Sequence, residues 1–230
     1  MWISWKLRDT DLARPIAFEQ KVEVFYDQTW GWQLHIADLI ANGGRPLGKQ
    51  TEVLPLPHSG FAVLHICLSY FETIGQYRGA RGRKYDVFKA GAKAVLPQLL
   101  SIPPDVREKL LKALYFGARC GLYHKSRTGR GVGLGEPPGG QPIDYDPDAR
   151  VLMISPKRLP RALKRHLEGY RKDLLNPSNG PMRKDFECQF DKDFGLSQSL
   201  PNERLQPAST RGPAGSRQPS SSRPRGGSAG

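Results

Sequence analysis

Cysteine is scarce in this sequence of 230 residues, which contains Cys67, Cys120 and Cys188 and no others. An odd number of widely spaced cysteines does not make a disulfide framework, and it lacks the paired spacing of a zinc site. Two of the three lie in apolar helical patterns, and we interpret all three as buried thiols of a protein in a reducing compartment. We expect neither a metal nor a cofactor.

Long apolar runs are also missing. No window approaches the roughly 18 apolar residues of a membrane span, and residues 1–9 lack the apolar core of a secretory signal. Residues 129–140 predict a glycine-rich loop, but this loop contains no Gly-Lys-Ser/Thr element, which argues against a nucleotide triphosphatase. These absences predict a cytoplasmic protein with no membrane partner.

Acidic residues are few relative to basic ones. Asp and Glu number 22 against 35 Lys and Arg, which gives a formal net charge of +13. Residues 201–230 hold five arginines and Glu203 as the lone acid, a net +4, so +9 remains on the rest of the chain. A basic body favours polyanions, either nucleic acid or an acidic membrane surface, although the same charge also serves solubility alone.

The spacing of apolar residues indicates a mainly α-helical fold. It predicts a bundle of four to five helices, over residues 12–41, 58–76, 85–100, 105–122 and 156–174. Two short strands, 141–146 and 150–154, predict a small β-hairpin at about 141–155, before the last helix. Residues 1–196 would form one domain. Residues 197–230, rich in Ser, Pro, Gly and Arg, would be a disordered basic tail.

Two polar features interrupt the predicted core helices. The second helix carries a narrow polar stripe, which is either solvated or lines a site and consists of His65, Ser69, Glu72 and Gln76. A basic, glycine-rich loop follows it and contributes Arg78, Arg81 and Arg83. These arginines are candidates for binding a nucleic-acid backbone.

The most informative motif is the string Arg119-Cys120-Gly121-Leu122-Tyr123-His124, near the end of the fourth helix. Arginine offers a fixed fork of donors for phosphate oxygens, and the ordinary pKa of histidine lies near neutrality. If both side chains face one phosphate, they suggest phosphodiester chemistry on RNA without a metal. The spacing recurs from Arg161 to His166, which we interpret as a coincidence on the exposed face of the last helix.

The predicted helical fold, with an Arg-x4-His motif near the end of the fourth helix, resembles the HEPN superfamily. Residues 69–74, 119–124 and 154–156 are more narrowly similar to a group of uncharacterised bacterial proteins with an Arg-Cys-Gly-Leu-(Phe/Tyr)-His motif. The resemblance covers about residues 18–191. It implies a HEPN-like bundle and a homodimer in which the arginine and histidine of two protomers face each other and cleave RNA without metal. Many members are toxins or antiviral effectors, so an antitoxin or a defence partner is also implied.

Carried to this sequence, the resemblance implies that His124 is a general acid or base on a ribose 2′-hydroxyl and that Arg119 holds the scissile phosphate. The products would carry 2′,3′-cyclic phosphate and 5′-hydroxyl ends. Glu72 and Ser69 would orient the pair. Further cations would extend the phosphate track, namely Lys125, Arg127 and Arg130.

Two other interpretations stay open. In one, the chain is a non-catalytic HEPN-like domain that binds RNA or a protein partner, which fits the sequence's departures from the family pattern at Cys120 and Ser126. In the other, the motif is structural: Arg119 forms a buried ion pair with Glu72, and His124 caps the end of its helix.

Overall fold

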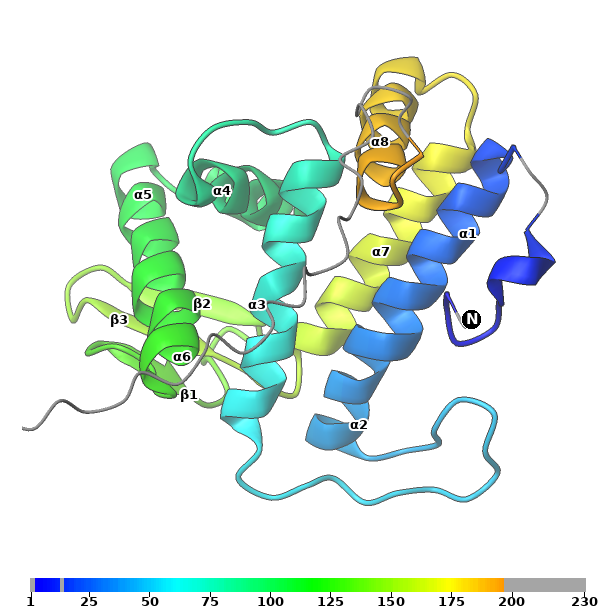
Figure 1. Cartoon of the computed structure of the whole chain (residues 1–230). Coiled ribbons are helices and arrows are strands. Elements are labelled where there is room, and N and C mark those ends of the chain that lie inside the picture. The colour runs from blue at the N-terminus through cyan, green and yellow to red at the C-terminus, as the bar shows by residue number, and fades with distance from the viewer. Residues whose placement is uncertain (1–2, 13–14, 197–230) are drawn as a thin grey trace, which may run out of the picture. The chain divides into compact units, whose positions relative to one another are not determined.

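A computed structural model describes residues 3–12 and 15–196 (Figure 1). It is mainly helical with a small sheet, which confirms the predicted fold class at that level. The predicted disordered tail, residues 197–230, lies outside the described residues. Within the described part of the chain, no helix combines the length and apolarity needed to cross a membrane.

The first predicted helix is two helices joined by a π-helical turn. Helix α1, Phe18–Thr29, continues through Trp30–Leu34 into α2, His35–Asn42. The prediction that it begins at residue 12 is wrong, because Ala17 has an extended backbone and its N–H donates to Gln20 Oε1 instead of joining a helix.

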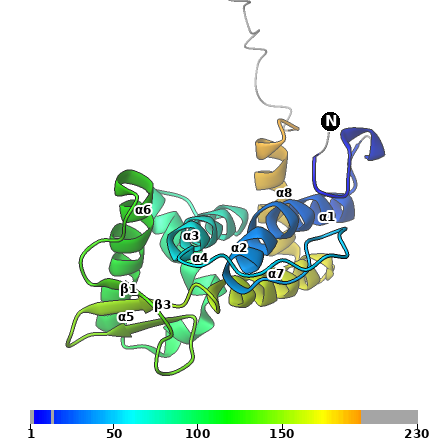
Figure 2. The ribbon, with the colours of Figure 1, turned by 90° about the horizontal axis from the view of Figure 1, so that it is seen from below.

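Helix α3, Gly60–Tyr77, lies in the middle of the molecule and packs against α4, Lys84–Val95 (Figures 1 and 2). The contact is very close: a Cβ on Gly91 of α4 would collide with the Phe71 carbonyl of α3. Helix α4 ends before the predicted residue 100, because Pro97 lacks an N–H and Leu96 before it leaves the helical conformation.

The fourth predicted helix is continuous but not uniform. Helix α5, Pro104–Lys112, passes through a π-helical segment, Ala113–Arg119, into α6, Cys120–Lys125. Ser126 then adopts a left-handed conformation with φ of 52° and ends the helix. Arg119 and His124 therefore lie on either side of a change in helical geometry.

The sheet contains the predicted hairpin and one further strand. Strands β2, Ile143–Asp146, and β3, Val151–Ile154, pair antiparallel. Strand β1, Val132–Leu134, pairs parallel to β3, giving the order β1-β3-β2. The prediction of a loop at this point is wrong, because these three residues form a strand only through pairing with β3, which local sequence does not show.

Helix α7, Leu159–Leu175, matches the last predicted helix, but α8, Gly180–Asp193, was not predicted. Of its side chains, Phe186, Gln189 and Phe190 are buried, too few for a clear amphipathic pattern. Phe186 packs edge-on against Phe18 and Phe25 of α1. Both views place α3 and α4 between the α1, α7 and α8 group and the α5, α6 and sheet group.

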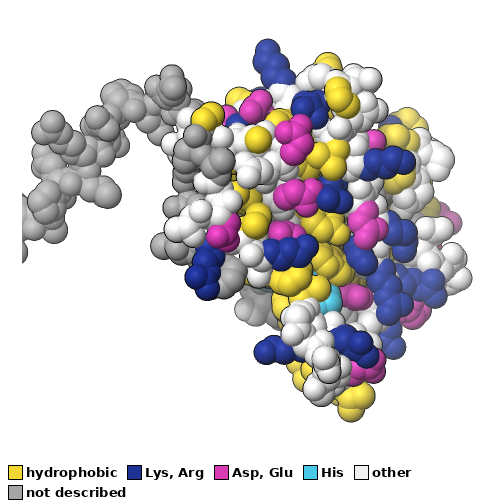
Figure 3. All heavy atoms as spheres, turned by 90° about the vertical axis from the view of Figure 1, so that its right-hand side faces the viewer, with side chains coloured by type: hydrophobic (Ala, Val, Ile, Leu, Met, Phe, Trp, Pro, Cys, Tyr) yellow, Lys and Arg dark blue, Asp and Glu magenta, His cyan; other side chains and the backbone are white. Residues whose placement is uncertain are grey.

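Part of the positive charge is used inside the fold. In α1, Lys21 is 8% exposed and lies 2.6 Å from Glu187 and 2.7 Å from Asp191 of α8. On the face shown in Figure 3, acidic side chains lie among the basic ones. The excess of positive charge therefore does not produce a uniformly positive surface. A binding site for an anion requires a local group of cations that lack acidic partners.

The expectation of three buried cysteines is only partly correct. Cys67 is buried in α3, and the surrounding protein raises its pKa by desolvation, whereas Cys120 is half-buried and Cys188 is exposed on α8. Cys188 is exposed because its neighbours Phe186, Gln189 and Phe190 take the buried positions of that helix.

Candidate functional site

The guanidinium of Arg119 is held by Glu72 of α3. Nη2 donates to Oε2 at 2.8 Å, and Nε lies 2.8 Å from Oε1, with the two side chains 12% and 20% exposed. Burial alone would lower the pKa of Arg119, but the hydrogen bond and charge of Glu72 outweigh it and raise the pKa. The ion pair that the sequence analysis left open is therefore present. It joins α3 to the π-helical segment that precedes α6.

Tyr123 lies between Arg119 and His65. The Arg119 guanidinium carbon is 4.3 Å from the Tyr123 ring centroid, and the His65 ring stacks on Tyr123 with centroids 4.1 Å apart and planes 22° apart. Two groups this close to one ring must occupy opposite faces. His65 is exposed and Tyr123 is 45% exposed, so the stack of guanidinium, phenol and imidazole ends at solvent on the His65 side.

His124 does not join this arrangement. It is exposed on α6, and it has no hydrogen bond, ion pair or ring contact with any other described residue. Its side chain therefore does not form the helix cap that the sequence analysis considered. A separation of five residues turns the side chain by roughly 140° around an ideal helix. Within one chain, therefore, Arg119 points to α3 while His124 points to solvent, and the two do not face one phosphate.

Ser69 is not a partner of either motif residue. Its hydroxyl donates to the Ile66 carbonyl of its own helix at 2.7 Å. Of the two predicted supporting residues, the structure brings Glu72 but not Ser69 to Arg119.

The predicted cations form two separate groups. Lys125 is the last residue of α6, and Arg127 and Arg130 follow that helix; all three are exposed and make no ion pair with other described residues. The other three, Arg78, Arg81 and Arg83, belong to the connection from α3 to α4, at the far end of α3 from this group (Figure 1). A single short phosphate track cannot include both groups.

In the connection from α3 to α4, two of the three arginines already have partners. Arg83 Nε lies 3.2 Å from Asp86 Oδ2, and the Arg78 guanidinium lies 5.9 Å from the Tyr170 ring. Lys125, Arg127 and Arg130 are therefore the better candidates for a backbone-binding surface.

The sequence interpretation of the second Arg-x4-His is correct for Arg161 but not for His166. Arg161 is exposed, but His166 points inward, and its Nδ1 lies 2.8 Å from the Tyr70 hydroxyl. Burial, and then the charge of Arg78, lower the pKa of His166 to about 4. The expectation of an exposed position is wrong because Tyr70, a buried residue of α3, offers the imidazole a partner that the periodicity of α7 does not reveal.

Sequence reasoning also missed the stacked pair. His65 was noted only as part of a polar stripe, and Tyr123 only as a motif position. The available signal was weak: an exposed aromatic beside the arginine, and a histidine on the facing helix. In residues 3–12 and 15–196, no three His, Cys, Asp or Glu side chains gather as metal ligands would. No protein-family model, curated protein or solved structure matches the chain.

Proposed function

We propose that this chain is a HEPN-like helical domain that binds single-stranded RNA at the His65–Tyr123 stack. The observation that carries the proposal is the open end of this stack, followed along the chain by three exposed cations that have no ion-pair partner among the described residues. Proteins commonly hold single-stranded RNA by these two kinds of contact: bases stack on aromatic or imidazole rings, and basic side chains neutralise the phosphates.

Each part of the site has a distinct role. The outer face of His65 receives a base, and Tyr123 supports the imidazole from behind. Arg119, which is held by Glu72 of α3, lies against the Tyr123 ring and fixes its position. Lys125, Arg127 and Arg130 contact the backbone, which contributes affinity without sequence preference.

The first test is the affinity of the full chain for a fluorescent single-stranded RNA, measured by anisotropy. His65→Ala should weaken binding about tenfold, because stacking contributes about 1–3 kcal/mol per base. His65→Tyr, which keeps a ring, should retain most of the affinity. The matched control is His58→Asn, since His58 is also exposed but has a φ of 59° that asparagine tolerates. Unchanged affinity in His65→Ala would contradict the proposal.

The second test is the salt dependence of the same binding. Neutralising Lys125, Arg127 and Arg130 to glutamine should reduce the slope of log K against log salt by about 2, because each phosphate contact contributes about 0.7 for a single strand. The control changes three exposed cations of α7 and α8 to glutamine, namely Lys172, Lys184 and Lys192. An equal change of slope in both variants would show general electrostatics rather than a site.

A second candidate function is a metal-independent endoribonuclease of toxin or antiviral type. The observation that favours it is the exposed imidazole of His124, next to Tyr123 of the stack, which contacts no partner within residues 3–12 and 15–196. The ribose 2′-oxygen would attack the adjacent phosphorus, the bond from phosphorus to O5′ would break, and His124 would accept the 2′-proton or supply one to O5′. Arg119 of each protomer in a homodimer would have only Nη1 to offer a phosphate, because Nε and Nη2 face Glu72.

One experiment separates the two functions. Labelled RNA is incubated in EDTA with the wild type and with His124→Ala, and cleavage, end chemistry and binding are recorded. Cleavage to 2′,3′-cyclic phosphate ends that disappears in the variant, with binding retained, establishes the ribonuclease. Intact RNA bound equally by both proteins establishes the binding domain. Sedimentation velocity on the same samples tests the implied homodimer.

A further inference from the structure

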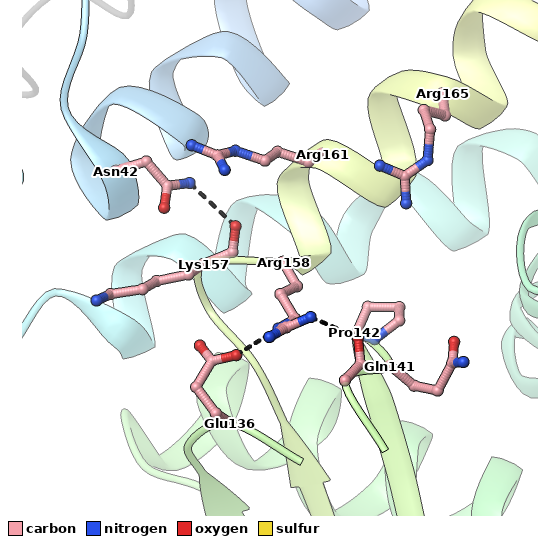
Figure 4. A pocket seen from close by; sticks show the side chains of 9 residues that line it. Asn42, Glu136, Gln141, Pro142, Lys157, Arg158, Arg161 and Arg165 are labelled. Carbon is pink, nitrogen blue, oxygen red and sulfur yellow. Dashed lines mark hydrogen bonds and ion pairs between the residues drawn. The ribbon is translucent and has the colours of Figure 1, made fainter. Parts of the chain in front are cut away.

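A basic cavity of about 570 Å³ lies at the start of α7, away from the Arg119 motif. Its walls come from three parts of the chain: the end of α2, the segment between β1 and β2, and the first turns of α7 with the residues just before them (Figure 4). The lining side chains with polar groups are Asn42, Glu136, Gln141, Lys157, Arg158, Arg161 and Arg165.

The cavity carries more positive than negative charge. Four of its lining residues are cations. Glu136 neutralises Arg158, with Oε2 lying 2.6 Å from Nε, and Asp38 approaches Arg161 at 3.4 Å. Counting both carboxylates leaves a net charge of +2.

The fold organises the floor of this cavity. Arg158 also donates from Nη1 to the Gly140 carbonyl at 2.8 Å, and Asn42 Nδ2 donates to the Lys157 carbonyl at 3.0 Å. Arg158 is thus fixed by two groups of the β1–β2 segment, the Gly140 carbonyl and the Glu136 carboxylate. Its contacts hold the cavity walls together and leave ligand binding to the other cations.

Lys157 and Arg165 make no ion pair with other described residues. Figure 4 shows the Arg165 side chain, one turn beyond Arg161 on α7, directed into the cavity. Arg158, Arg161 and Arg165 share one face of α7. Arg158 and Arg161 lie at the positive end of the helix, where cations oppose the helix dipole, and Arg161 and Arg165, one turn apart, repel each other. A bound anion would relieve both effects.

We propose that this cavity binds an oligophosphate group, a chain of two or three phosphates. Arginine forks match phosphate oxygens in pairs, and an excess of cations suits a multiply charged anion better than a single carboxylate. Of the described residues that line the cavity, none is aromatic, so nothing there would stack on a base. The site therefore recognises the phosphates and not the group attached to them. The proposal does not depend on RNA binding at His65.

The test uses isothermal titration calorimetry of the full chain with sodium pyrophosphate and with tripolyphosphate, in 150 mM salt, about the physiological ionic strength. One oligophosphate should bind per chain. Arg165→Gln should weaken binding about tenfold or more, since it removes a charge-assisted contact. The matched control is Lys172→Gln, an exposed cation near the other end of the same helix, which should bind as the wild type does.

A second variant predicts the opposite direction. Glu136→Gln removes the carboxylate that engages Arg158 and should tighten binding severalfold, provided that circular dichroism shows an intact fold. No binding by the wild type, or equal weakening in Arg165→Gln and Lys172→Gln, would overturn the proposal.

The oligophosphate has two possible sources, and further arms of the titration distinguish them. If a 5′-triphosphate RNA binds more tightly than the same RNA with a 5′-hydroxyl, and Arg165→Gln abolishes the difference, the cavity holds an RNA end. If the two RNAs bind equally while a free nucleoside triphosphate or tripolyphosphate binds in an Arg165-dependent way, the ligand is a free oligophosphate. Both results support the site.

Discussion

Replacing Arg119 with alanine tests how firmly the Arg119–Glu72 pair joins the π-helical segment before α6 to α3. The Glu72 side chain is 20% exposed, so after the substitution its carboxylate would remain where little water can reach it. Loss of one partner costs about 3–5 kcal/mol for a fully buried pair, and exposed pairs contribute about 0–1 kcal/mol. Because this pair is mostly buried, we expect Arg119→Ala to lower the free energy of unfolding by about 3 kcal/mol.

The assay is urea unfolding at pH 7, followed by far-ultraviolet circular dichroism. In thermal unfolding the same loss corresponds to a fall in Tm of about 6–12 °C for a domain of this size. Glu72→Gln and the double variant complete a double-mutant cycle, and we expect a coupling energy of about 2 kcal/mol.

Two results would refute this reasoning. A loss below about 1 kcal/mol in Arg119→Ala would mean that the pair behaves like one on the surface. A coupling energy near zero would mean that any loss comes from the contact of Arg119 with Tyr123, not from Glu72. In the first case a ligand could take the guanidinium from Glu72 at little cost, and the case for the ribonuclease would be stronger.

Two further predictions concern stability. Since the pKa of His166 is lowered to about 4, the unfolded chain takes up a proton near pH 6.5 that the folded chain refuses, so stability is complete above pH 6.5 and falls as the pH drops toward 4. Between pH 7 and pH 5 the free energy of unfolding should fall by about 2 kcal/mol from this cause. Urea unfolding of His166→Gln at the two pH values should not show this loss. Equal losses in both proteins would contradict the assignment of the pH dependence to His166. Gly91→Ala should destabilise by about 3 kcal/mol, because its Cβ collides with the Phe71 backbone. Gly169→Ala, in the same kind of helix position but with open space around it, should stabilise by up to about 1 kcal/mol; thermal unfolding that ranks the two variants the other way would refute the packing argument.

The helices that the sequence predicted best are those with a broad apolar face. Helix α3 combines such a face with a clear start, and its predicted bounds, 58–76, lie close to Gly60–Tyr77. Helix α8 buries few side chains, so its pattern is faint, and β1 has no pattern at all. Both elements depend on partners far away in the chain, which a local pattern cannot show.

The candidate site divides in the same way. The arginine and histidine of the motif, and the polar stripe that contains Glu72, could be found from residue type and spacing. The angle of roughly 140° between the two motif side chains also follows from their spacing. Which of them faces α3 could not be found, because a π-helical segment precedes Cys120 and shifts the phase of every later side chain. The arginines of the basic cavity had a signal, the spacing of Arg158, Arg161 and Arg165 on one helix face, but its other walls come from distant segments.

Local patterns of apolar residues were sufficient to predict the fold class, the hairpin and most helices, because each of these depends on neighbours within a few turns or residues. Composition alone gave the surplus of positive charge. Contacts between distant segments settled the rest. Glu72 of α3 takes Arg119 out of solvent, Tyr70 draws His166 inward, and His65 completes a stack with Tyr123. Neighbours in space decide whether a polar side chain forms contacts within the fold or remains available to a ligand. Spacing along one helix does not contain that information.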